Sequence, residues 1–341
     1  MKKADIGVAL YILAAVIFLI VPINSTLLDV MLALNISLAL IVLFNTLFVK
    51  EVLDMSFFPT LLLFTTIFRI ALNVSSTRLI LTTGQPGNVV ETFGNFVGGG
   101  DMIVGAVVFI ILIIIQFVVI NKGSERVAEV SARFTLDAMP GKQMAIDADL
   151  NTGAITEAQA RERRNKIQEE ASFFGSMDGA TKYVKGDAAA GLIITLVNLI
   201  GGTAMGMMRG GMEFGEAIQR YGLLTMGDGL CSQIPSLLIS LATGILVTKA
   251  SKEADFSNIL VGQLFGIPKV LYLVGGALAF LGIFTPLEWF LFVPLGIAFV
   301  VAGKMVDKNI GIESIEEEVS MAETEAEEIR KPENVVSLLQ V

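Results

Sequence analysis

Charged side chains inside apolar segments are the residues of this sequence that could do chemistry. Arg69, Arg78, Asp187 and Asp228 each lie within or at the edge of a run apolar enough to cross a membrane. A charge is costly in the hydrocarbon core, so such residues usually face a bundle interior or a wet cavity and mark routes for ions or protons. The sequence therefore predicts a site for proton or ion coupling rather than an enzyme active site.

Asp187 is the carboxylate that we expect to accept a proton. It ends the run K-Y-V-K-G-D, in which Lys182 and Lys185 precede it, at the cytoplasmic edge of a predicted span. We expect these two cations to balance its charge, so protonation would alter how the neighbouring loop rests against the membrane. Capping of a helix N-terminus is the alternative role for Asp187.

Two further acidic residues lie near the outer ends of predicted spans. Asp228 stands in T-M-G-D-G-L between Gly227 and Gly229, which permit close approach of backbone or water, and we favour a functional role for it. Asp29 stands at the start of the second predicted span, and we expect it to cap a helix N-terminus.

Arg69 and Arg78 belong to one predicted span but to different faces of it. Arg69 lies roughly 18 Å along the helix, near mid-membrane, and Asn73, Ser76 and Thr77 follow at helical spacing to give a polar face. Arg78 is half a turn out of phase with Arg69, so it faces another helix or reaches outward. For both arginines an interhelical salt bridge is as plausible as direct participation.

Several classes of active site are excluded by composition. The chain has no histidine and one cysteine, Cys231, so it has neither a Ser-His-Asp nor a Cys-His arrangement and no C-x-x-C motif. It also lacks G-x-x-x-x-G-K-[ST] and a G-x-G-x-x-G that follows a strand. We therefore expect no enzymatic activity, no cofactor, no metal and no nucleic-acid partner, and energy that comes from a partner or from the membrane.

The elements that must position these residues are membrane helices. The chain is 54% hydrophobic with a mean hydropathy of +0.72. The run 270–303 is too long for one span, and Thr285-Pro286-Leu287-Glu288 breaks it into two short helices. The sequence thus predicts an all-α polytopic membrane protein with about eight transmembrane helices. The other six predicted spans are 6–23, 30–49, 55–83, 102–120, 188–208 and 229–248.

The distribution of cations predicts the orientation and the domains. With both termini in the cytoplasm, 20 of the 24 Lys and Arg residues lie on the cytoplasmic side. The predicted parts are four helices (1–120), a large cytoplasmic loop between helices 4 and 5 (121–187), four more helices (188–303) and an acidic linker (304–341). Within the loop, Thr156-x-x-Gln159 resembles a capping box that opens a helix of about a dozen residues. The linker ends at 332–341, where alternation predicts the start of a strand.

Small residues at 202, 206 and 210 form a repeated G-x-x-x-G ridge in the fifth predicted span. Such ridges let two helices approach closely. Helix packing is therefore the role we expect for it.

Four segments together resemble one known family. They are R-I-A-L-N-V-S-S-T-R at 69–78, D-A-M-P-G-K-Q-M-A-I-D-A-D-L at 137–150, F-F-G-S-M-D-G-A-T-K-Y-V-K-G-D at 173–187 and T-M-G-D-G-L at 225–230. With the eight spans and the large loop, they are similar to the FHIPEP family, the large export-gate subunit of flagellar and virulence type III secretion systems.

The resemblance implies a function and a set of partners. It implies a homo-oligomeric, nonameric ring in the bacterial inner membrane, at the flagellar basal body or an injectisome, that couples the proton motive force to export of unfolded protein. The implied partners are other export-gate membrane subunits, the cytoplasmic export ATPase complex, the basal-body ring and exported substrates. Family members continue past V-V-S-L-L-Q-V into a domain that receives chaperones, so we expect no chaperone docking by this chain.

The resemblance also implies roles for individual residues. Arg78, Lys182, Asp187 and Asp228 match the charges that are critical in the family, and Arg69, Lys185 and Asp29 are supporting candidates. The cytoplasmic segment that relays changes between membrane and export machinery is matched by Arg133, Asp137, Asp147 and Asp149.

Two other functions are compatible with the same residues. A small-solute or cation transporter would use the same carboxylates, although no clear inverted repeat supports it. A structural scaffold would anchor export components while another subunit conducts protons. The sequence leaves open whether the ion is a proton or sodium, and we favour a flagellar over a virulence system on overall likeness.

Overall fold

The computed structural model describes residues 3–98, 101–249, 256–284 and 288–308. Every regular element in those ranges is a helix, which confirms the all-α membrane fold. The chain divides into two compact units, Met1–Glu253 and Ala254–Val341. The residues predicted to form the acidic linker beyond 308, and the strand predicted at 332–341, lie outside the described residues.

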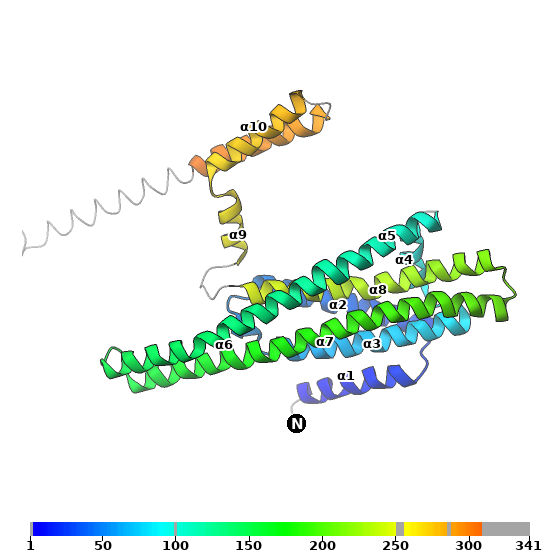
Figure 1. The fold of residues 1–341 in the computed structure, drawn as a ribbon, viewed down its shortest axis with the longest axis horizontal. Coiled ribbons are helices and arrows are strands. Elements are labelled where there is room, and N and C mark those ends of the chain that lie inside the picture. Colours follow the sequence, from blue (N-terminus) through cyan, green and yellow to red (C-terminus); the bar gives the residue numbers. More distant parts are fainter. Residues whose placement is uncertain (1–2, 99–100, 250–255, 285–287, 309–341) are drawn as a thin grey trace, which may run out of the picture. The chain divides into compact units, whose positions relative to one another are not determined.

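The first unit holds the charged residues singled out above, and Figure 1 labels its α-helices. Two segments are not α-helical: η1 (Val52–Met55) is a short 3₁₀ helix, and η2 (Ile115–Asn121) is a π-helix. The α-helices are α1 (Lys3–Ile20), α2 (Ser25–Phe48), α3 (Phe58–Thr83), α4 (Asn88–Gly98), α5 (Met102–Ile114), α6 (Lys122–Asn151), α7 (Glu157–Gly210) and α8 (Phe214–Thr248).

Six helical stretches of the described residues are long and apolar enough to cross a membrane: Ser25–Phe48, Val52–Thr83, Met102–Asn151, Glu157–Gly210, Phe214–Thr248 and Trp289–Lys308. The two remaining predicted spans correspond to shorter apolar helices, Ala9–Ile20 within α1 and Pro268–Phe284. The apolar segments were therefore predicted correctly, whereas the count of eight spanning helices stays a prediction.

The predicted loop 121–187 is a helical hairpin that continues two of the spans. Residues Met102–Asn151 form one helical run through α5, η2 and α6, and α7 is a single helix of 54 residues, about 80 Å long. Figure 1 shows α6 and α7 side by side over the length of the hairpin. Ile146, Ala160 and Ile167 form its small apolar core.

The predicted capping box at the start of α7 is confirmed, but the predicted helix length was wrong. The Thr156 backbone N–H donates to Gln159 Oε1 at 2.8 Å, and the Gln159 N–H donates to Thr156 Oγ1 at 3.3 Å. The helix does not stop after about a dozen residues but continues to Gly210, and the stretch 157–210 contains no proline. A charged half and an apolar half therefore belong to one continuous helix.

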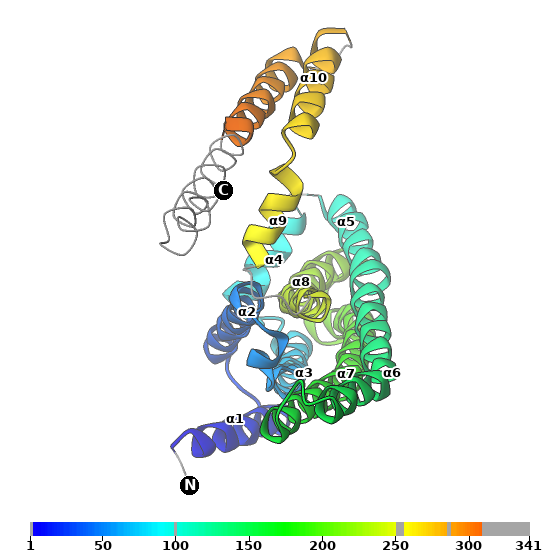
Figure 2. The same cartoon turned by 90° about the vertical axis from the view of Figure 1, so that its left-hand side faces the viewer.

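Helix α8 lies in the middle of the first unit, as the end-on view of Figure 2 shows. It packs against α2, α3, α4, α6 and α7. The G-x-x-x-G ridge has the predicted packing role, because a Cβ at Gly202 or Gly206 on α7 would meet the ring of Tyr221 on α8. Small residues thus bring α7 against the helix that carries Asp228.

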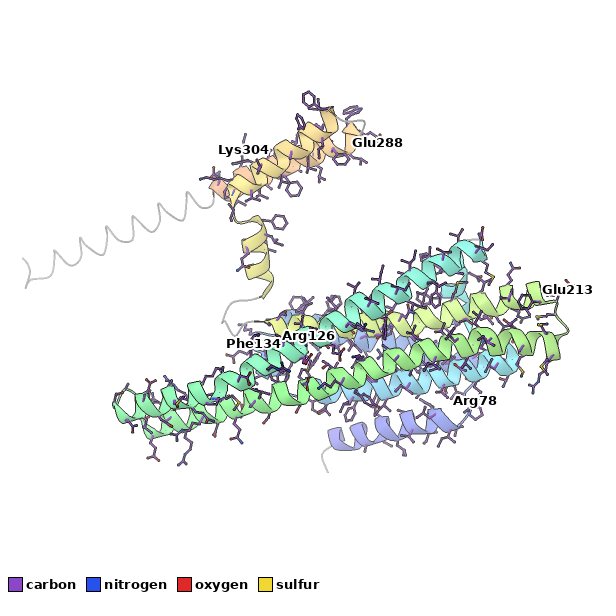
Figure 3. All side chains as sticks on the ribbon, viewed as in Figure 1. Arg78, Arg126, Phe134, Glu213, Glu288 and Lys304 are labelled. Atoms are coloured by element: carbon purple, nitrogen blue, oxygen red, sulfur yellow. The ribbon has the colours of Figure 1, made fainter. Side chains whose placement is uncertain are left out.

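The second unit contains α9 (Phe256–Phe265), α10 (Pro268–Phe284) and a helix at Trp289–Lys308. Helix α10 ends at Phe284 and the next begins at Trp289, so the two helices predicted in 270–303 are present, while residues 285–287 of the predicted break lie outside the described residues. Gly275 on α10 and Gly296 on the following helix pack against each other's backbones. Figure 3 labels Glu288 and Lys304 near the two ends of that following helix.

Candidate functional site

A buried ion pair joins α3 to α7. Arg69 Nε donates to Asp187 Oδ2 at 2.6 Å, and Arg69 Nη2 donates to the same oxygen. The two side chains are only 2% and 4% exposed. The salt bridge expected as one role of Arg69 is confirmed, and its partner is 118 residues away in the sequence. A pair this deeply buried depends on both partners, because either charge alone would be uncompensated.

The cations predicted to balance Asp187 have other partners. Lys182 Nζ pairs with Asp178 at 2.7 Å, and Lys185 Nζ pairs with Glu125 of α6 at 2.9 Å. On a helix, residues two and five positions apart do not share a face, so neither lysine points where Asp187 points. The expectation that these lysines neutralise Asp187 was therefore wrong, and Arg69 does so.

A small cavity of about 40 Å³, with both polar and apolar residues in its lining, borders the ion pair. Three buried polar atoms of its lining have no hydrogen-bond partner in the described part of the chain: Arg69 Nη1, Asn121 Nδ2 and Ser236 Oγ. One water needs roughly 10–15 Å³ of such space together with polar partners. The site can therefore hold water directly beside Arg69 and Asp187.

Asp228 is held by uncharged groups. Its Oδ1 contacts the Ser76 hydroxyl, and its Oδ2 accepts a hydrogen bond from Asn198 Nδ2 at 2.8 Å. The residue is 5% exposed, and none of the ion pairs between described residues includes it. The two membrane carboxylates thus have different surroundings, one paired with a cation and the other bound by a hydroxyl and an amide.

The predicted polar face of α3 reaches both carboxylates. Arg69 and Ser76 are two turns apart, about 10 Å along the helix, and Asn73 lies between them. All three are buried. One face of α3 therefore contacts both carboxylates, Asp187 through Arg69 and Asp228 through Ser76.

The glycines beside Asp228 serve helix packing. A Cβ at Gly227 would meet the Val90 carbonyl oxygen of α4, and a Cβ at Gly229 would meet the ring of Phe109. Close backbone approach is confirmed for Gly227, whereas both glycine positions are filled by protein rather than open to water.

Arg78 and Asp29 each bind the end of another helix. Arg78 donates to the carbonyl oxygens of Ile20 at 3.0 Å and Leu19 at 3.2 Å, at the C-terminus of α1, where a cation is favourable. Figure 3 labels Arg78 on the α3 side that α1 covers. The Asp29 carboxylate accepts from the backbone N–H groups of Asn88 and Val89, at 2.9 and 3.0 Å.

The expected capping role of Asp29 is confirmed, but on a different helix. Asp29 lies within α2 and caps the start of α4, whereas α2 itself is capped by Asn24. Any part that Asp29 or Arg78 plays in ion coupling stays a prediction.

The four loop residues lie on the hairpin. Asp147 pairs with Arg164 at 2.5 Å and Asp149 with Arg163 at 3.1 Å, which joins α6 to α7 near the tip. Arg133 lies 3.7 Å from Glu129 on the same helix, and Asp137 is exposed. Their predicted coupling role is not tested by these contacts.

The pairs at the hairpin tip should contribute little stability, because all four side chains are about half exposed. An exposed pair is typically worth about 0.2–1 kcal/mol. The double variant Asp147→Asn/Asp149→Asn should therefore destabilise the hairpin by no more than about 2 kcal/mol. Hydrogen exchange of the tip amides measures this, and the difference from wild type should shrink at high salt. A larger, salt-independent loss would show that these carboxylates act through packing.

Four buried polar residues of the site were missed by sequence reasoning: Gln116, Asn121, Asn198 and Ser236. Each is a neutral group in an apolar run, such as I-I-I-Q-F-V-V-I-N. Attention to charges alone overlooked them, although an amide in a membrane helix is itself a sign of an interior contact. No group of three or more Cys, Asp or Glu side chains suited to a metal ion occurs among the described residues.

Comparison with known proteins places the chain in a family. The model of the FHIPEP family matches residues 15–341. The chain is 51% identical over its whole length to half of the flagellar biosynthesis protein FlhA of Bacillus subtilis. It is 50% identical over 80% of its length to FlhA of Salmonella typhimurium, covering 40% of that protein.

A virulence protein is also similar. The low calcium response locus protein D of Yersinia pestis is 49% identical over 82% of the chain, again across 40% of its own length. The chain therefore spans about half the length, or less, of the curated relatives it matches. No solved structure matches it. Since the family model covers nearly the entire chain and full-length identity reaches one half, the chain belongs to the FHIPEP family.

Proposed function

We propose that this chain is the membrane part of the export-gate subunit of a bacterial flagellar, type III protein export apparatus. It couples the proton motive force to translocation of unfolded protein across the inner membrane. Two relatives are named as flagellar biosynthesis proteins, which supports the export role. The observation that carries the coupling role is the buried Arg69–Asp187 pair beside a cavity able to hold water.

Protonation of Asp187 is the energy-coupling step. It removes the negative charge and leaves Arg69 buried without compensation, at a cost of about 3–5 kcal/mol. A proton that crosses the membrane potential carries about 2.3 kcal/mol per 100 mV. The two energies are of similar size, so proton binding can shift α3 against α7 between two arrangements.

Helix α7 transmits this shift to the cytoplasm. It runs without interruption from Asp187 back to Glu157, over about 45 Å. A change at the ion pair therefore moves the hairpin that carries Arg133, Asp137, Asp147 and Asp149. Protonation of Asp187 is thus a local electrostatic change that the rigid helix α7 converts into a movement of the distant hairpin.

Family membership and the distribution of charge support the environment and the partners of this proposal. The excess of Lys and Arg on one side supports cytoplasmic termini and a cytoplasmic hairpin. The subunit works in a homo-oligomeric ring in the flagellar basal body, with the other gate subunits, the ATPase complex, the basal-body ring and exported substrates as partners.

Proton flux into liposomes that contain the purified chain tests the coupling role. Wild type should conduct under an imposed potential, as followed with an internal pH dye. The double variant Arg69→Gln/Asp187→Asn, which removes both charges together, should give only the flux of protein-free liposomes.

Arg126→Gln is the control, because Arg126 is an exposed residue of α6 (Figure 3). It should conduct like wild type. Absence of flux through the wild-type chain would indicate a scaffold that does not conduct protons. Wild-type flux through the double variant would show that the proton pathway does not include Asp187.

A further inference from the structure

We propose that the crevice between η2, α7 and α8 is a water-filled passage that leads from the cytoplasmic end of the bundle to Asp187. The inference rests on the proposed function, in that it supplies the route by which Asp187 receives its proton. Asn121, Ser236 and Ser240 line the passage, and its ligand is a short chain of water molecules.

The π-helix η2 gives the crevice its polar wall. In an α-helix, residues five apart point in different directions, but in a π-helix they share a face because the backbone bonds join residues five apart. Gln116 and Asn121 are five apart and both are buried residues of η2. The π turn therefore aims both amides at α8, where Gln116 Nε2 donates to the Gln233 carbonyl oxygen at 3.1 Å.

The passage has an upper end at Asp187 and a lower end at the cytoplasmic hairpin. Its upper end is the cavity beside the ion pair. Asn121 Nδ2, Ser236 Oγ and Arg69 Nη1 border it without a partner in the described chain. Leaving a buried donor unsatisfied costs about 1–3 kcal/mol. Three such groups around one space of about 40 Å³ are best explained by resident water.

The lower end is a second, smaller space that shares Asn121 with the first. It measures about 10 Å³, and Ser124, Thr181 and Ser240 are among its lining residues. Ser240 Oγ donates to Asn121 Oδ1 at 3.0 Å, and Ser124 Oγ donates to the Ser240 carbonyl at 2.9 Å. A continuous line of polar groups therefore joins the two spaces.

The Glu125–Lys185 pair forms the mouth. Both residues line the lower space, and their side chains are 19% and 43% exposed, so this end reaches the surface. In the proposed orientation the mouth lies at the cytoplasmic hairpin. The passage ends at Asp187, because Asp228 lines neither space.

The adjoining face of α8 is dry. Ile239, Ala242 and Leu246 belong to a large apolar cluster with residues of α2 and α3. Ser236, Ser240 and Thr243 follow one another at helical spacing on the polar face. Water is thus confined to one side of α8. A position on the wet side and one on the dry side of the same helix can therefore be compared.

Hydrogen–deuterium exchange of a single thiol, followed by its S–H infrared band in lipid nanodiscs, tests the proposal. Ser236→Cys in a Cys231→Ala chain should exchange as fast as D₂O is mixed. Two dry controls are wild type, whose only cysteine is buried in an apolar cluster, and Ile239→Cys in the same Cys231→Ala chain. Both should exchange at least about tenfold more slowly, since they depend on local opening.

Plugging the lower space tests the direction of access. Ser240→Val and, independently, Ser124→Val should slow exchange at Ser236→Cys by about tenfold, because the short route to solvent is then closed. A Ser236→Cys thiol as protected as Ile239→Cys would overturn the passage, and unchanged exchange behind both plugs would overturn its cytoplasmic course. If the thiol exchanges fast while Arg69→Gln/Asp187→Asn still conducts, the passage stands and the proposed function fails.

Discussion

Replacement of Arg69 by methionine should lower the free energy of unfolding of the membrane unit by about 3–5 kcal/mol, the usual cost of removing one partner of a buried ion pair. The reason is that Asp187, whose side chain is 4% exposed, would keep its place between α3 and α7 with no cation beside it. Titration with SDS from mixed micelles, followed by far-UV circular dichroism, measures the loss.

The double variant Arg69→Met/Asp187→Leu is the matched control. Removing both charges while filling the space should return the stability to wild type or exceed it by about 1–4 kcal/mol, because two desolvated charges are replaced by apolar contact. The prediction fails if the single variant is within about 1 kcal/mol of wild type, the size of an exposed pair. It also fails if the double variant is as unstable as the single one.

A stable but inactive double variant would explain why the charges are present. An apolar pair at these positions would hold α3 against α7 at least as well, so the ion pair is not there for stability alone. The pair differs from an apolar one in that a single proton can break it.

The class of fold and the kind of site could be predicted from the sequence. Apolar runs of about 20 residues indicated membrane helices, and charges within them indicated an interior site. Arg69, Asp187 and Asp228 are indeed buried. These signals are local, and each needs only a short window of sequence.

The partner of Asp187 could not be predicted in the same way. Arg69 is 118 residues away, and only the packing of α3 against α7 brings them together. The nearby Lys182 and Lys185 were favoured because they are neighbours in sequence, although helical geometry already turns them from the face of Asp187. Spacing on the helix was therefore a better guide than proximity along the chain.

Helix ends were harder to predict than helix locations. Hydropathy changes near residues 121 and 187, but it marks the membrane surface and not a break in the backbone. The structure carries α7 through 187 without interruption, and the run from Met102 to Asn151 passes 121 as a π turn. No feature of I-Q-F-V-V-I-N distinguishes a π-helix from an α-helix, so the turn that orients Gln116 and Asn121 had no sequence signal.

Gly227→Val should separate α4 from α8 and disturb the second carboxylate. A Cβ at Gly227 would meet the Val90 carbonyl oxygen and the Gly94 backbone nitrogen, and backbone atoms cannot turn aside as a side chain can. Overpacking of a core usually costs about 1–3 kcal/mol, and we expect the upper part of that range or more. Asp228 follows directly in the chain, so its contacts with Ser76 and Asn198 should be lost as well.

Gly215→Val provides the comparison, because it adds the same β-branched residue to the same helix at an exposed position where a Cβ would meet nothing within 4 Å. Both variants make the same exchange of glycine for a better helix former in the same helix, so helix propensity does not account for a lower SDS unfolding midpoint in Gly227→Val, and the clash with α4 does. Equal midpoints would mean that α4 does not press on α8 at Gly227. A lowered midpoint in Gly227→Val alone would show that the close crossing of α4 and α8 at Gly227 contributes to holding this end of the bundle together.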